Sequence, residues 1–472
     1  MMKIERILSS MALAALVTVS FNAHAASINA DDARMAANNF LKQHAVSVPG
    51  TSFKAPALAD IKLAHAEASS IEGNDYYVFN IQGGGWVIIA GDDRANQVLA
   101  YSDKGSLSIN DLPENAKSYL GRYKREIEAL KSLKGETQLQ QPKRAGKVVE
   151  PLLPSINWAQ QSPFNYQCPT YNGSRSSVGC AALAMAQIVN YWEYPNHMPA
   201  LSGYQNSYYY QQVPSLEARD IDYDLIRDQY TTWTEDDKLA WVEGVTDEEK
   251  QEVAWLCRYC AQACLMNFSP DGSGSNVLKQ KNAFMTIGYS SDAKLLGIEA
   301  WPSRETWNTT DYSDAEWTEL MNAQLEAGRP IPYSCEDFSI GHAFVVDGVD
   351  AEGLYHVSWG WYGRGDGWFQ HRAFNVTVQG EYMEFNDALF MVVDLYPYEG
   401  YVSPNAPGSE PEVKTGDVNG DGEVNISDVT DLIDMLLQGG ATDTKADVNG
   451  DGDVNISDVT DLIDMLLQGK NQ

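Results

Sequence analysis

Cysteine and positive charge are both scarce in this chain of 472 residues. The chain has only 33 Lys and Arg residues but 65 Asp and Glu residues, which gives a net charge of -32. This balance excludes a nucleic-acid surface or an anionic-membrane surface as the main binding site, because contacts to phosphates require clustered basic side chains. Six cysteines are too few to form a disulfide framework in an exported chain of this length.

Long apolar runs are also missing after the N-terminus. Residues 1–25 have the layout of a secretory signal, in which Lys3 and Arg6 precede an apolar stretch and Ala23-His24-Ala25 supplies a small-x-small cleavage site. The stretch is too short for the alternative, a membrane anchor. We therefore expect an exported chain that begins at Ala26, is secreted or attached to the cell surface, and has no transmembrane segment.

One cysteine differs from the others in its surroundings. Cys180 follows the loop segment 176–179 and begins a run of small helix-forming residues, so its thiol is expected at a helix N-terminus. The free amides and the helix dipole there favour the thiolate, which is the nucleophilic form. His342 precedes an apolar strand and supplies a candidate base. Together, Cys180 and His342 predict a cysteine hydrolase.

Three further cysteines have helical spacing, namely Cys257, Cys260 and Cys264. This spacing superficially suggests a metal or redox motif. No second pair of ligands accompanies them, and free cysteine is among the most buried residue types. We therefore expect these side chains to lie in the core. His356, on an apolar strand, is expected to be structural.

The composition divides the chain into units. Residues 26–147 predict a compact α+β unit that is closed by a helix over 114–133, with Lys and Arg on its outer face, and that ends in a basic stretch a protease could cut. Residues 148–400 hold Cys180, His342 and most of the tryptophan and tyrosine. Residues 401–416 are rich in proline and acidic residues, so we expect an extended, solvated linker.

The last part of the chain, residues 417–472, contains an internal repeat. Residues 417–439 and 447–469 are identical except that Glu423 is replaced by Asp453. Each copy begins Asp-x-Asn-x-Asp-Gly, the oxygen-ligand spacing of a twelve-residue calcium loop with a backbone carbonyl at the seventh position. Without a cation, so many carboxylates would repel one another.

The predicted calcium ligands occupy equivalent positions in the two loops. They are Asp417, Asn419, Asp421, Glu423, Asn425 and Asp428 in the first loop, and Asp447, Asn449, Asp451, Asp453, Asn455 and Asp458 in the second. After each loop, apolar residues fall on one face of a short helix, so the two faces can bury each other. In the first copy these are Val429, Leu432, Ile433, Leu436 and Leu437.

The middle unit resembles the streptopain family of secreted bacterial cysteine peptidases, which are papain-like enzymes made with an inhibitory prodomain. Four stretches carry the similarity: Trp158 to Pro169, Val178 to Pro195, Gly341 to Phe344, and Tyr355 to Gly367. Residues 86–92 match the prodomain of that family loosely. The resemblance implies an α+β fold, with a papain-like peptidase domain at 148–400 after an α+β inhibitory prodomain at 26–147.

The resemblance also implies catalytic roles. Cys180 corresponds to the nucleophile, and His342 to the general base that later protonates the leaving amine. Gln160 corresponds to a side-chain donor of the oxyanion hole. Trp361 corresponds to the residue that shields and orients the imidazole. Ser358 stands where an asparagine is expected, which leaves the hydrogen-bond partner of the imidazole open.

Two further residues, Ser273 and Gly341, resemble substrate-contacting positions of the family. Some of these assignments have simpler alternatives. Trp359 and Trp361 could be core aromatics, and Gln160 could be a surface amide.

The tail resembles the dockerin repeat, in which two loop-helix segments pack as an antiparallel pair into a small all-α domain. It departs from an EF-hand at position twelve, where Asp428 and Asp458 replace a glutamate. The resemblance implies structural Ca²⁺ in the tail and none in catalysis. It also implies attachment to a partner, which for dockerins is usually a cohesin domain, or to the cell surface.

These features predict a secreted cysteine endopeptidase that is made as a zymogen, is cut between about Arg144 and Val148, and acts on protein or peptide substrates. Two alternatives stay open. One is an inactive, peptidase-like surface binding protein, against which the intact set of catalytic positions argues. The other is a different thiol acyl-transfer enzyme, against which the processable prodomain argues.

Overall fold

The computed structural model describes most of the chain between residues 27 and 468. The described residues are 27–47, 56–133, 147–234, 238–298, 312–336, 341–373, 377–378, 381–382, 388–398, 401–405, 416, 418, 424, 426–437, 446–449 and 454–468. The predicted signal sequence, 1–25, lies outside them. Within these ranges, every helix is too short or too polar to span a bilayer.

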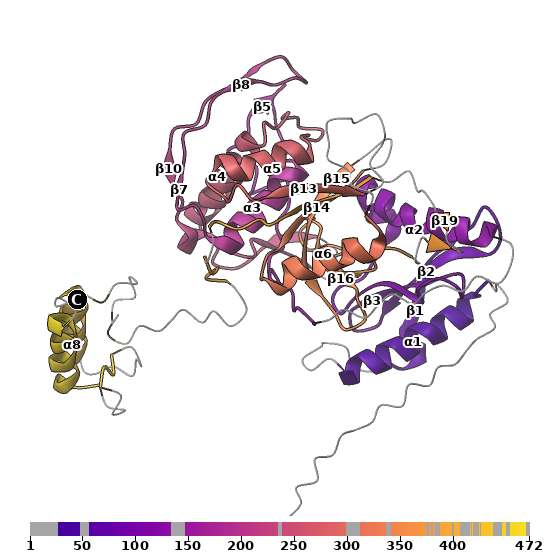
Figure 1. Ribbon diagram of the computed structural model, residues 1–472, viewed down its shortest axis with the longest axis horizontal. Helices are drawn as coiled ribbons and strands as arrows, with labels where there is room; N and C mark the ends of the chain where they lie inside the picture. The colour runs from indigo at the N-terminus through magenta and orange to yellow at the C-terminus, as the bar shows by residue number, and fades with distance from the viewer. Residues whose placement is uncertain are drawn as a thin grey trace, which may run out of the picture.

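The N-terminal unit is a four-stranded antiparallel sheet covered by a helix on each face (Figure 1). Along β2, Tyr77 and Phe79 pack against one helix, whereas Tyr76 and Val78 pack against the other. This alternation follows from the two-residue period of a strand. The elements are α1 (Ala30–Ser47), β1 (Ile61–Ala68), β2 (Asn74–Ile81), β3 (Trp86–Ala90), β4 (Val98–Ser102) and α2 (Glu114–Ser132).

The sheet of this unit continues into the peptidase unit. β4 pairs with β17, where Tyr101 lies opposite Trp368 and Ala100 opposite Phe369. The result is one ten-stranded sheet in the order β1-β2-β3-β4-β17-β16-β15-β14-β20-β13. The strands of the second half are β13 (Lys294–Ile298), β14 (Ile331–Glu336), β15 (Gly341–Val349), β16 (Tyr355–Ser358), β17 (Gly367–Phe369) and β20 (Ala388–Val393).

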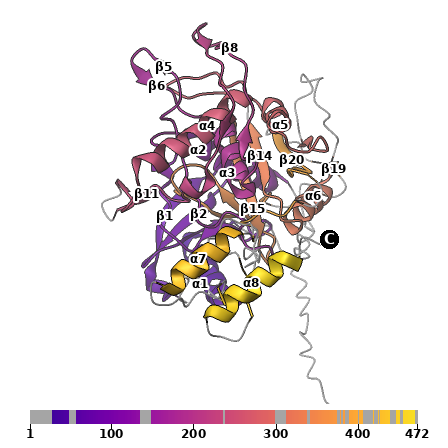
Figure 2. The ribbon, with the colours of Figure 1, turned by 90° about the vertical axis from the view of Figure 1, so that its left-hand side faces the viewer.

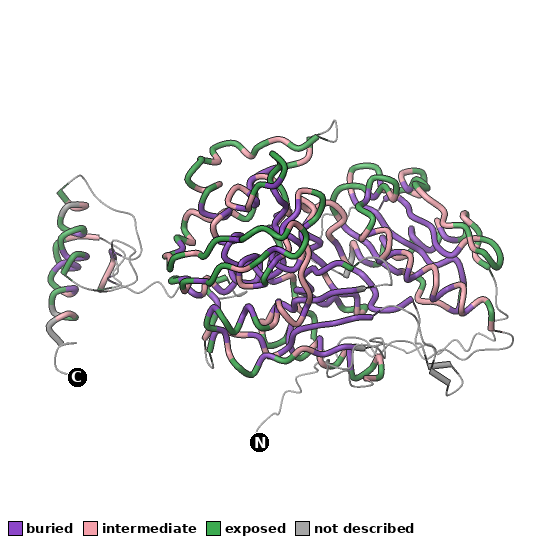
Figure 3. Tube along the Cα trace, turned by 90° about the horizontal axis from the view of Figure 1, so that it is seen from above, coloured by how far each residue is buried: buried purple, intermediate pink, exposed green. Residues whose placement is uncertain are grey.

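Helices cover both faces of the second half of the sheet. α3 (Cys180–Trp192) is central, because every residue from 181 to 192 is buried, as expected for a helix in which nearly all residues are apolar. α4 (Asp247–Ala263) and α5 (Val277–Thr286) pack around it, while α6 (Asp314–Glu326) covers the opposite face. The buried segments run through the middle of the molecule, and exposed hairpins surround them (Figure 3).

Short strands form hairpins and ribbons outside the main sheet. They are β5 (Thr170–Tyr171) with β6 (Ser174–Arg175), β7 (His197–Met198) with β10 (Arg219–Asp220), β8 (Tyr204–Gln205) with β9 (Gln212–Val213), β11 (Thr231–Trp233) with β12 (Leu239–Trp241), and β18 (Thr377–Val378) with β19 (Glu381–Tyr382).

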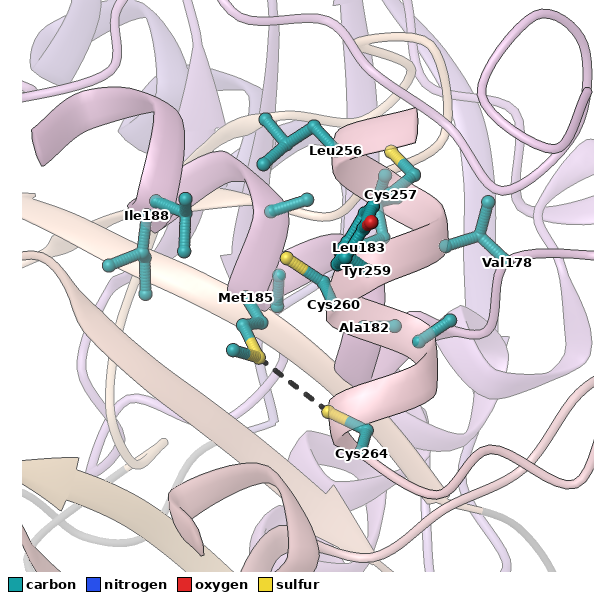
Figure 4. Close-up of a cluster of buried hydrophobic side chains, with 14 of the residues drawn as sticks. Val178, Ala182, Leu183, Met185, Ile188, Leu256, Cys257, Tyr259, Cys260 and Cys264 are labelled. Atoms are coloured by element: carbon teal, nitrogen blue, oxygen red, sulfur yellow. Dashed lines mark hydrogen bonds between the residues drawn. The ribbon is translucent and has the colours of Figure 1, made fainter. Parts of the chain in front are cut away.

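The three helically spaced cysteines lie in the core between α3 and α4 (Figure 4). Cys257, Cys260 and Cys264 are fully buried, and the thiol of Cys264 lies 3.7 Å from the sulfur of Met185. Burial raises the pKa of each of these three thiols. The prediction of packed core side chains is confirmed.

Residues 401–405 pack on the C-terminal end of α3. The Tyr401 hydroxyl donates to the carbonyl of Trp192 at 2.9 Å, and Asn405 Nδ2 donates to the carbonyl of Tyr191 at 3.2 Å. The Ser403 side chain is buried against the same turn. The expectation of a solvated linker is therefore wrong for Tyr401, Ser403 and Asn405, because they satisfy carbonyls that the end of a helix leaves without partners. Val402 and Pro404, between them, are exposed as expected.

In the tail, α7 (Ile426–Leu437) and α8 (Ile456–Gln468) pack against each other, as Figure 2 shows. Val429 and Leu432 are buried together with their counterparts Val459 and Leu462, as the repeat predicts. Ile433 and Leu437 are exposed, so the buried face is narrower than the predicted one.

Candidate active site

Cys180 is the first residue of α3, as predicted. The N-cap residue Gly179 has a positive φ of 91°, and a Cβ there would lie 2.6 Å from Met266 Sδ, so the position requires glycine. Cys180 is partly exposed, whereas the other five cysteines are buried, and none of the six forms a disulfide. Among the cysteines, Cys180 is thus the one that is accessible and lies at a helix N-terminus.

The segment with Gln160 lies beside the residues that precede the nucleophile. The Val178 amide donates to the Gln160 carbonyl at 2.9 Å. Ala159 forms a bridge with Trp361 on the other side. Gln160 is partly buried. The backbone of Gln160 is therefore next to the loop that precedes Cys180.

His342 lies near the start of β15, and both ring nitrogens have partners. Nε2 lies 2.9 Å from the carbonyl oxygen of Trp359. A carbonyl only accepts, so Nε2 carries the proton. Nδ1 is then the acceptor for Asn115 Nδ2, at 2.7 Å. The partner left open by Ser358 is thus the Trp359 carbonyl, and the basic nitrogen of His342 is held by a side chain of α2.

Two tryptophans stack beside this imidazole. The ring of Trp361 lies 4.8 Å from that of His342 at 20°, and Trp359 stacks on Trp361 at 5.1 Å and 3°. His342 is buried, and burial lowers its pKa from 6.5 to about 4. The imidazole is therefore neutral at physiological pH, and Trp361 lies where a residue that shields it is predicted.

Ser273 and Gly341, the two predicted substrate-contacting residues, differ from each other in their surroundings. The Ser273 hydroxyl donates to the Ser177 carbonyl at 2.7 Å and accepts from the Ser269 amide at 2.9 Å. The hydroxyl therefore braces the loop before Cys180. Gly341 is exposed at the start of β15 and lines a small cavity with Asn115 and His342.

The second histidine of this region, His356, lies on β16. Its Nδ1 lies 2.6 Å from Asp347 Oδ1, and Asp347 also accepts from the Leu153 amide at 2.8 Å. Burial lowers the pKa of His356, but the charge of Asp347, the hydrogen bond to it and the charge of Asp366 together raise the pKa above its usual value. This ion pair joins β15, β16 and the segment near residue 153, which agrees with a structural histidine.

Helix α2 of the N-terminal unit covers the site. The Tyr119 ring meets Trp359 edge-on at 4.8 Å and Phe344 at 5.8 Å. Asn115, one turn earlier, reaches His342. Sequence reasoning missed Asn115, because an asparagine in the first turn of an ordinary-looking helix carries no local signal of a contact 227 residues away.

Polar contacts hold this cover in place. Glu126 of α2 is fully buried and accepts from Arg372 Nη1 at 3.1 Å and from the Ala373 amide at 2.6 Å. Tyr123 donates to the Gln370 carbonyl at 2.6 Å. The buried guanidinium of Arg122 lies over the Tyr119 ring. The expectation of basic residues on an outer face of this helix is wrong for Arg122, because the peptidase unit covers that face.

Replacing Asn115 with alanine removes the donor to Nδ1. A hydrogen bond contributes about 1 kcal/mol net, so we expect the precursor to process itself about fivefold faster than the wild type. The rate is measured from chain length over time. The matched control is Glu114→Ala, which changes the neighbouring exposed residue and should leave the rate unchanged. Equal rates for Asn115→Ala and the wild type would contradict the role of Asn115.

The titration of His342 should depend on the cover. In a Cys180→Ala precursor, NMR of labelled histidine should show a pKa of about 4. After removal of the N-terminal unit, the pKa should rise toward 6.5, the usual value. The released form then binds a proton between about pH 6.5 and 4 that the precursor does not bind, so acidification in this window favours release. An unchanged titration would show that the cover does not bury His342.

The second of the two predicted calcium loops is described in part, and its described residues fit a cation. Asp458 is fully buried, with Oδ1 accepting from the Val448 amide at 2.9 Å and Oδ2 from the Asn455 amide at 2.8 Å. Asp428, its counterpart, is also fully buried. Buried carboxylates in an all-oxygen donor set suit Ca²⁺.

The described residues contain no group of three or more His, Cys, Asp or Glu side chains placed to hold a metal. Of the remaining predicted ligands, Asp447, Asn449 and Asn455 are described. The others lie outside the described residues, namely Asp417, Asn419, Asp421, Glu423, Asn425, Asp451 and Asp453.

Family comparisons divide the chain in the same way. Residues 158–369 match the Peptidase C10 family, residues 25–127 match the Spi protease inhibitor, and residues 415–467 match the dockerin type I domain. Type I dockerins bind calcium, which is consistent with structural Ca²⁺ in the tail.

Several known proteins are similar over much of this length. Streptopain from Streptococcus pyogenes is 29% identical over 401 residues, which covers 79% of this chain and 93% of streptopain. Thiol protease/hemagglutinin PrtT from Porphyromonas gingivalis is 26% identical over 311 residues, or 62% of this chain and 33% of that protein.

Among solved structures, a prointerpain A fragment from Prevotella intermedia superposes with a TM-score of 0.53 at 25% identity, covering 70% of this chain and 98% of the fragment. The predicted α+β, papain-like fold is confirmed. The chain thus carries a Peptidase C10 domain of the streptopain family between a Spi-type inhibitor domain and a dockerin type I domain, and it is a cysteine peptidase.

Proposed function

We propose that this chain is a secreted cysteine endopeptidase made as a zymogen, in which Cys180 and His342 hydrolyse peptide bonds and the N-terminal unit withholds the histidine. The observation that carries the proposal is the hydrogen bond from Asn115 to His342 Nδ1 at 2.7 Å. With Nε2 donating to Trp359, Nδ1 is the nitrogen that has to take the thiol proton. The inhibitory unit thus blocks the nitrogen of His342 that acts as the base.

Catalysis follows once Asn115 has left. Nδ1 of His342 accepts the proton of Cys180, whose thiolate is stabilised at the N-terminus of α3. The thiolate attacks the peptide carbonyl, and the oxyanion is held by the Cys180 amide and the Gln160 side chain, each such donor lowering the barrier by about 3 kcal/mol. The imidazolium returns its proton to the departing amine. Water, deprotonated by His342, then hydrolyses the thioester.

Maturation by a cut between about Arg144 and Val148 agrees with where the peptidase unit begins. The amide and carbonyl of Val149 both bond to Val349, each at 2.9 Å. Val148, immediately before, is largely exposed. A cut before Val148 leaves this pairing, and with it the peptidase sheet, intact.

The proposal extends to both ends of the chain. The signal-like residues 1–25 direct export, and the dockerin domain attaches the enzyme to a cohesin-type partner or to a cell-surface component. Calcium would be held by the two loops that precede α7 and α8, with Asp428 and Asp458 at their closing positions. Its role there is to neutralise carboxylates so that the loops fold.

Removal of calcium should therefore melt the tail and spare catalysis. A chelator in excess is expected to abolish the helical signal of α7 and α8, since their shared core is small. Peptide hydrolysis by the same processed sample should change less than about twofold, because no catalytic residue lies in the tail. Helicity is followed by circular dichroism before and after calcium is added back. A tail that stays helical in the chelator would contradict calcium-dependent folding.

The zymogen is tested by incubating the purified precursor beside a Cys180→Ala version under mild reducing conditions. The wild type should lose its N-terminal unit and gain activity that thiol alkylation stops, while the variant stays full length. If both stay intact, a clip near Lys147 by an added protease decides between two readings. Activity then means maturation by another protease, and continued inactivity would overturn the proposed function.

A further inference from the structure

We propose that the tyrosine hairpin, residues 204–213, forms an outer wall of the substrate cleft, where Tyr208 receives an aromatic or large apolar side chain of the substrate. The side chain in question is the third residue on the acyl side of the cleaved bond. This inference rests on the proposed function, because it takes Cys180 as the nucleophile.

The hairpin is firmly attached to the loop 266–274. Asn206, which is fully buried, donates to the Phe268 carbonyl at 2.8 Å and accepts from the Tyr208 amide at 2.8 Å. The Tyr204 hydroxyl donates to the Met266 carbonyl at 2.7 Å. The position of the hairpin is therefore set by the loop, although β8 and β9 are only two residues long each.

The three consecutive tyrosines have different surroundings. Tyr209 faces inward, where it stacks on Tyr171 at 4.6 Å and 12° and its hydroxyl lies 3.2 Å from Ser269 Oγ. Tyr208 and Tyr210 are 54% and 77% exposed. The hairpin and its neighbour β5–β6 project from the same end of the molecule (Figure 2). One tyrosine thus anchors the hairpin, and two rings are presented to solvent.

The loop 266–274 connects Tyr208 with the nucleophile. The Tyr208 hydroxyl lies 2.5 Å from the position that a Cβ on Gly274 would take, so the side chain lies against that glycine. The Ser273 amide donates to Ser177 Oγ at 2.9 Å. The Ser273 carbonyl lies 3.2 Å from the corresponding Cβ position of Gly179, the residue before Cys180.

These contacts also indicate on which side of the cleaved bond Tyr208 lies and how far it is from the nucleophile. The leaving amine has to lie near His342 and Trp361, whereas the loop reaches the nucleophile through Ser177 and Gly179. We therefore assign the loop to the acyl half of the substrate. The path from Gly179 through Ser273 and Gly274 to the Tyr208 hydroxyl is roughly 10 Å long when bond lengths are added to these contacts, and an extended peptide covers that distance in about three residues.

A tyrosine held in this way suits one class of ligand. Its ring offers a large contact area that loses little entropy on binding and favours stacked or edge-on contact with another ring. Aromatic and large apolar side chains would therefore gain most at this position, and an acidic side chain would gain nothing from the ring.

The test uses the full-length chain after processing and a set of fluorogenic peptides that differ only at the third acyl-side residue, as Phe, Leu, Ala or Asp. The wild type should prefer Phe to Ala by about tenfold in kcat/KM. Tyr208→Ala should lower kcat/KM for the Phe peptide about tenfold, mainly through KM, and change the Ala peptide less than about twofold. Tyr208→Phe should keep the preference.

The matched control is Tyr398→Ala. Tyr398 is 55% exposed and packs on Tyr401 at 5.0 Å, near the C-terminal end of α3. A helix of 13 residues places it about 20 Å from the Cys180 end. This variant should retain the wild-type preference.

Two results would overturn the inference. Tyr208→Ala could affect all four peptides equally, or it could leave the preference for Phe unchanged. A different failure is recognisable: if the wild type hydrolyses none of the peptides before or after clipping, and alkylation of Cys180 changes nothing, the proposed function is wrong and the inference falls with it.

Discussion

Replacing Cys180 with alanine is expected to lower kcat of the processed chain by at least about 10³-fold, because the variant has no nucleophile and retains only substrate binding and the oxyanion donors. The substitution removes one partly exposed sulfur from the first turn of α3, where the other residues are well buried. The fold should therefore persist. Hydrolysis of a fluorogenic peptide at saturating concentration measures the loss, and circular dichroism checks the fold.

Cys264→Ala is the matched control for this result. Cys264 is also in the peptidase unit, but it is fully buried and touches the sulfur of Met185. Its loss should cost about 1 kcal/mol of stability and leave kcat within about twofold of the wild type. If Cys180→Ala retained activity, or if Cys264→Ala lost it without unfolding, the nucleophile would be assigned to the wrong cysteine.

Replacing Glu126 with alanine is expected to detach the N-terminal unit far more effectively than loss of Asn115. Glu126 is fully buried and bonds to Arg372, and Arg122 lies 3.9 Å away. Without the carboxylate, two buried guanidinium groups lose their shared counter-charge. Breaking such a pair costs about 3 kcal/mol or more. Arg372 retains a contact with Asp314 at 3.4 Å, so we expect a loss of stability near the lower limit of about 3 kcal/mol.

The measurement uses the Cys180→Ala background, so that processing does not intervene. Urea unfolding should show that the variant loses about 3 kcal/mol, and an added protease should cut near residue 147 sooner. Glu126→Gln is the control, because it keeps an oxygen acceptor for the Ala373 amide and should lose less. Equal stability of the alanine variant and its parent would show that the ion pair does not hold the cover.

Features that are determined by short stretches of sequence could be predicted from the sequence alone. The small residues after Cys180 place the thiol at a helix start, because local composition determines where such a helix begins. The near-identical repeat at 417–469 predicts the paired helices of the tail. The helical spacing of Cys257, Cys260 and Cys264 predicts their burial, since one face of α4 packs on α3.

Features that depend on contacts between distant parts of the chain could not be predicted from the sequence. The continuation of the sheet through β4 and β17 joins residues 100 and 369, and no local pattern encodes that partner. Asn115 and Glu126 belong to a helix whose polar positions indicate a solvated face until the peptidase unit covers them. Composition predicts a linker at residues 401–405, although Tyr401, Ser403 and Asn405 donate hydrogen bonds to carbonyls at the end of α3. In each case the contact partner, rather than the local propensity, determines the burial.

The most direct test of the central claim, a thiol nucleophile kept from its base by the N-terminal unit, is to map alkylation of the cysteines by mass spectrometry in the precursor and in the processed chain. We predict that a small haloacetamide labels Cys180 in the processed chain at neutral pH, with loss of activity in proportion, and labels it much more slowly in the precursor, where Asn115 occupies His342 Nδ1. Equal labelling of Cys180 in the two forms, or inactivation that follows another cysteine, would contradict the account.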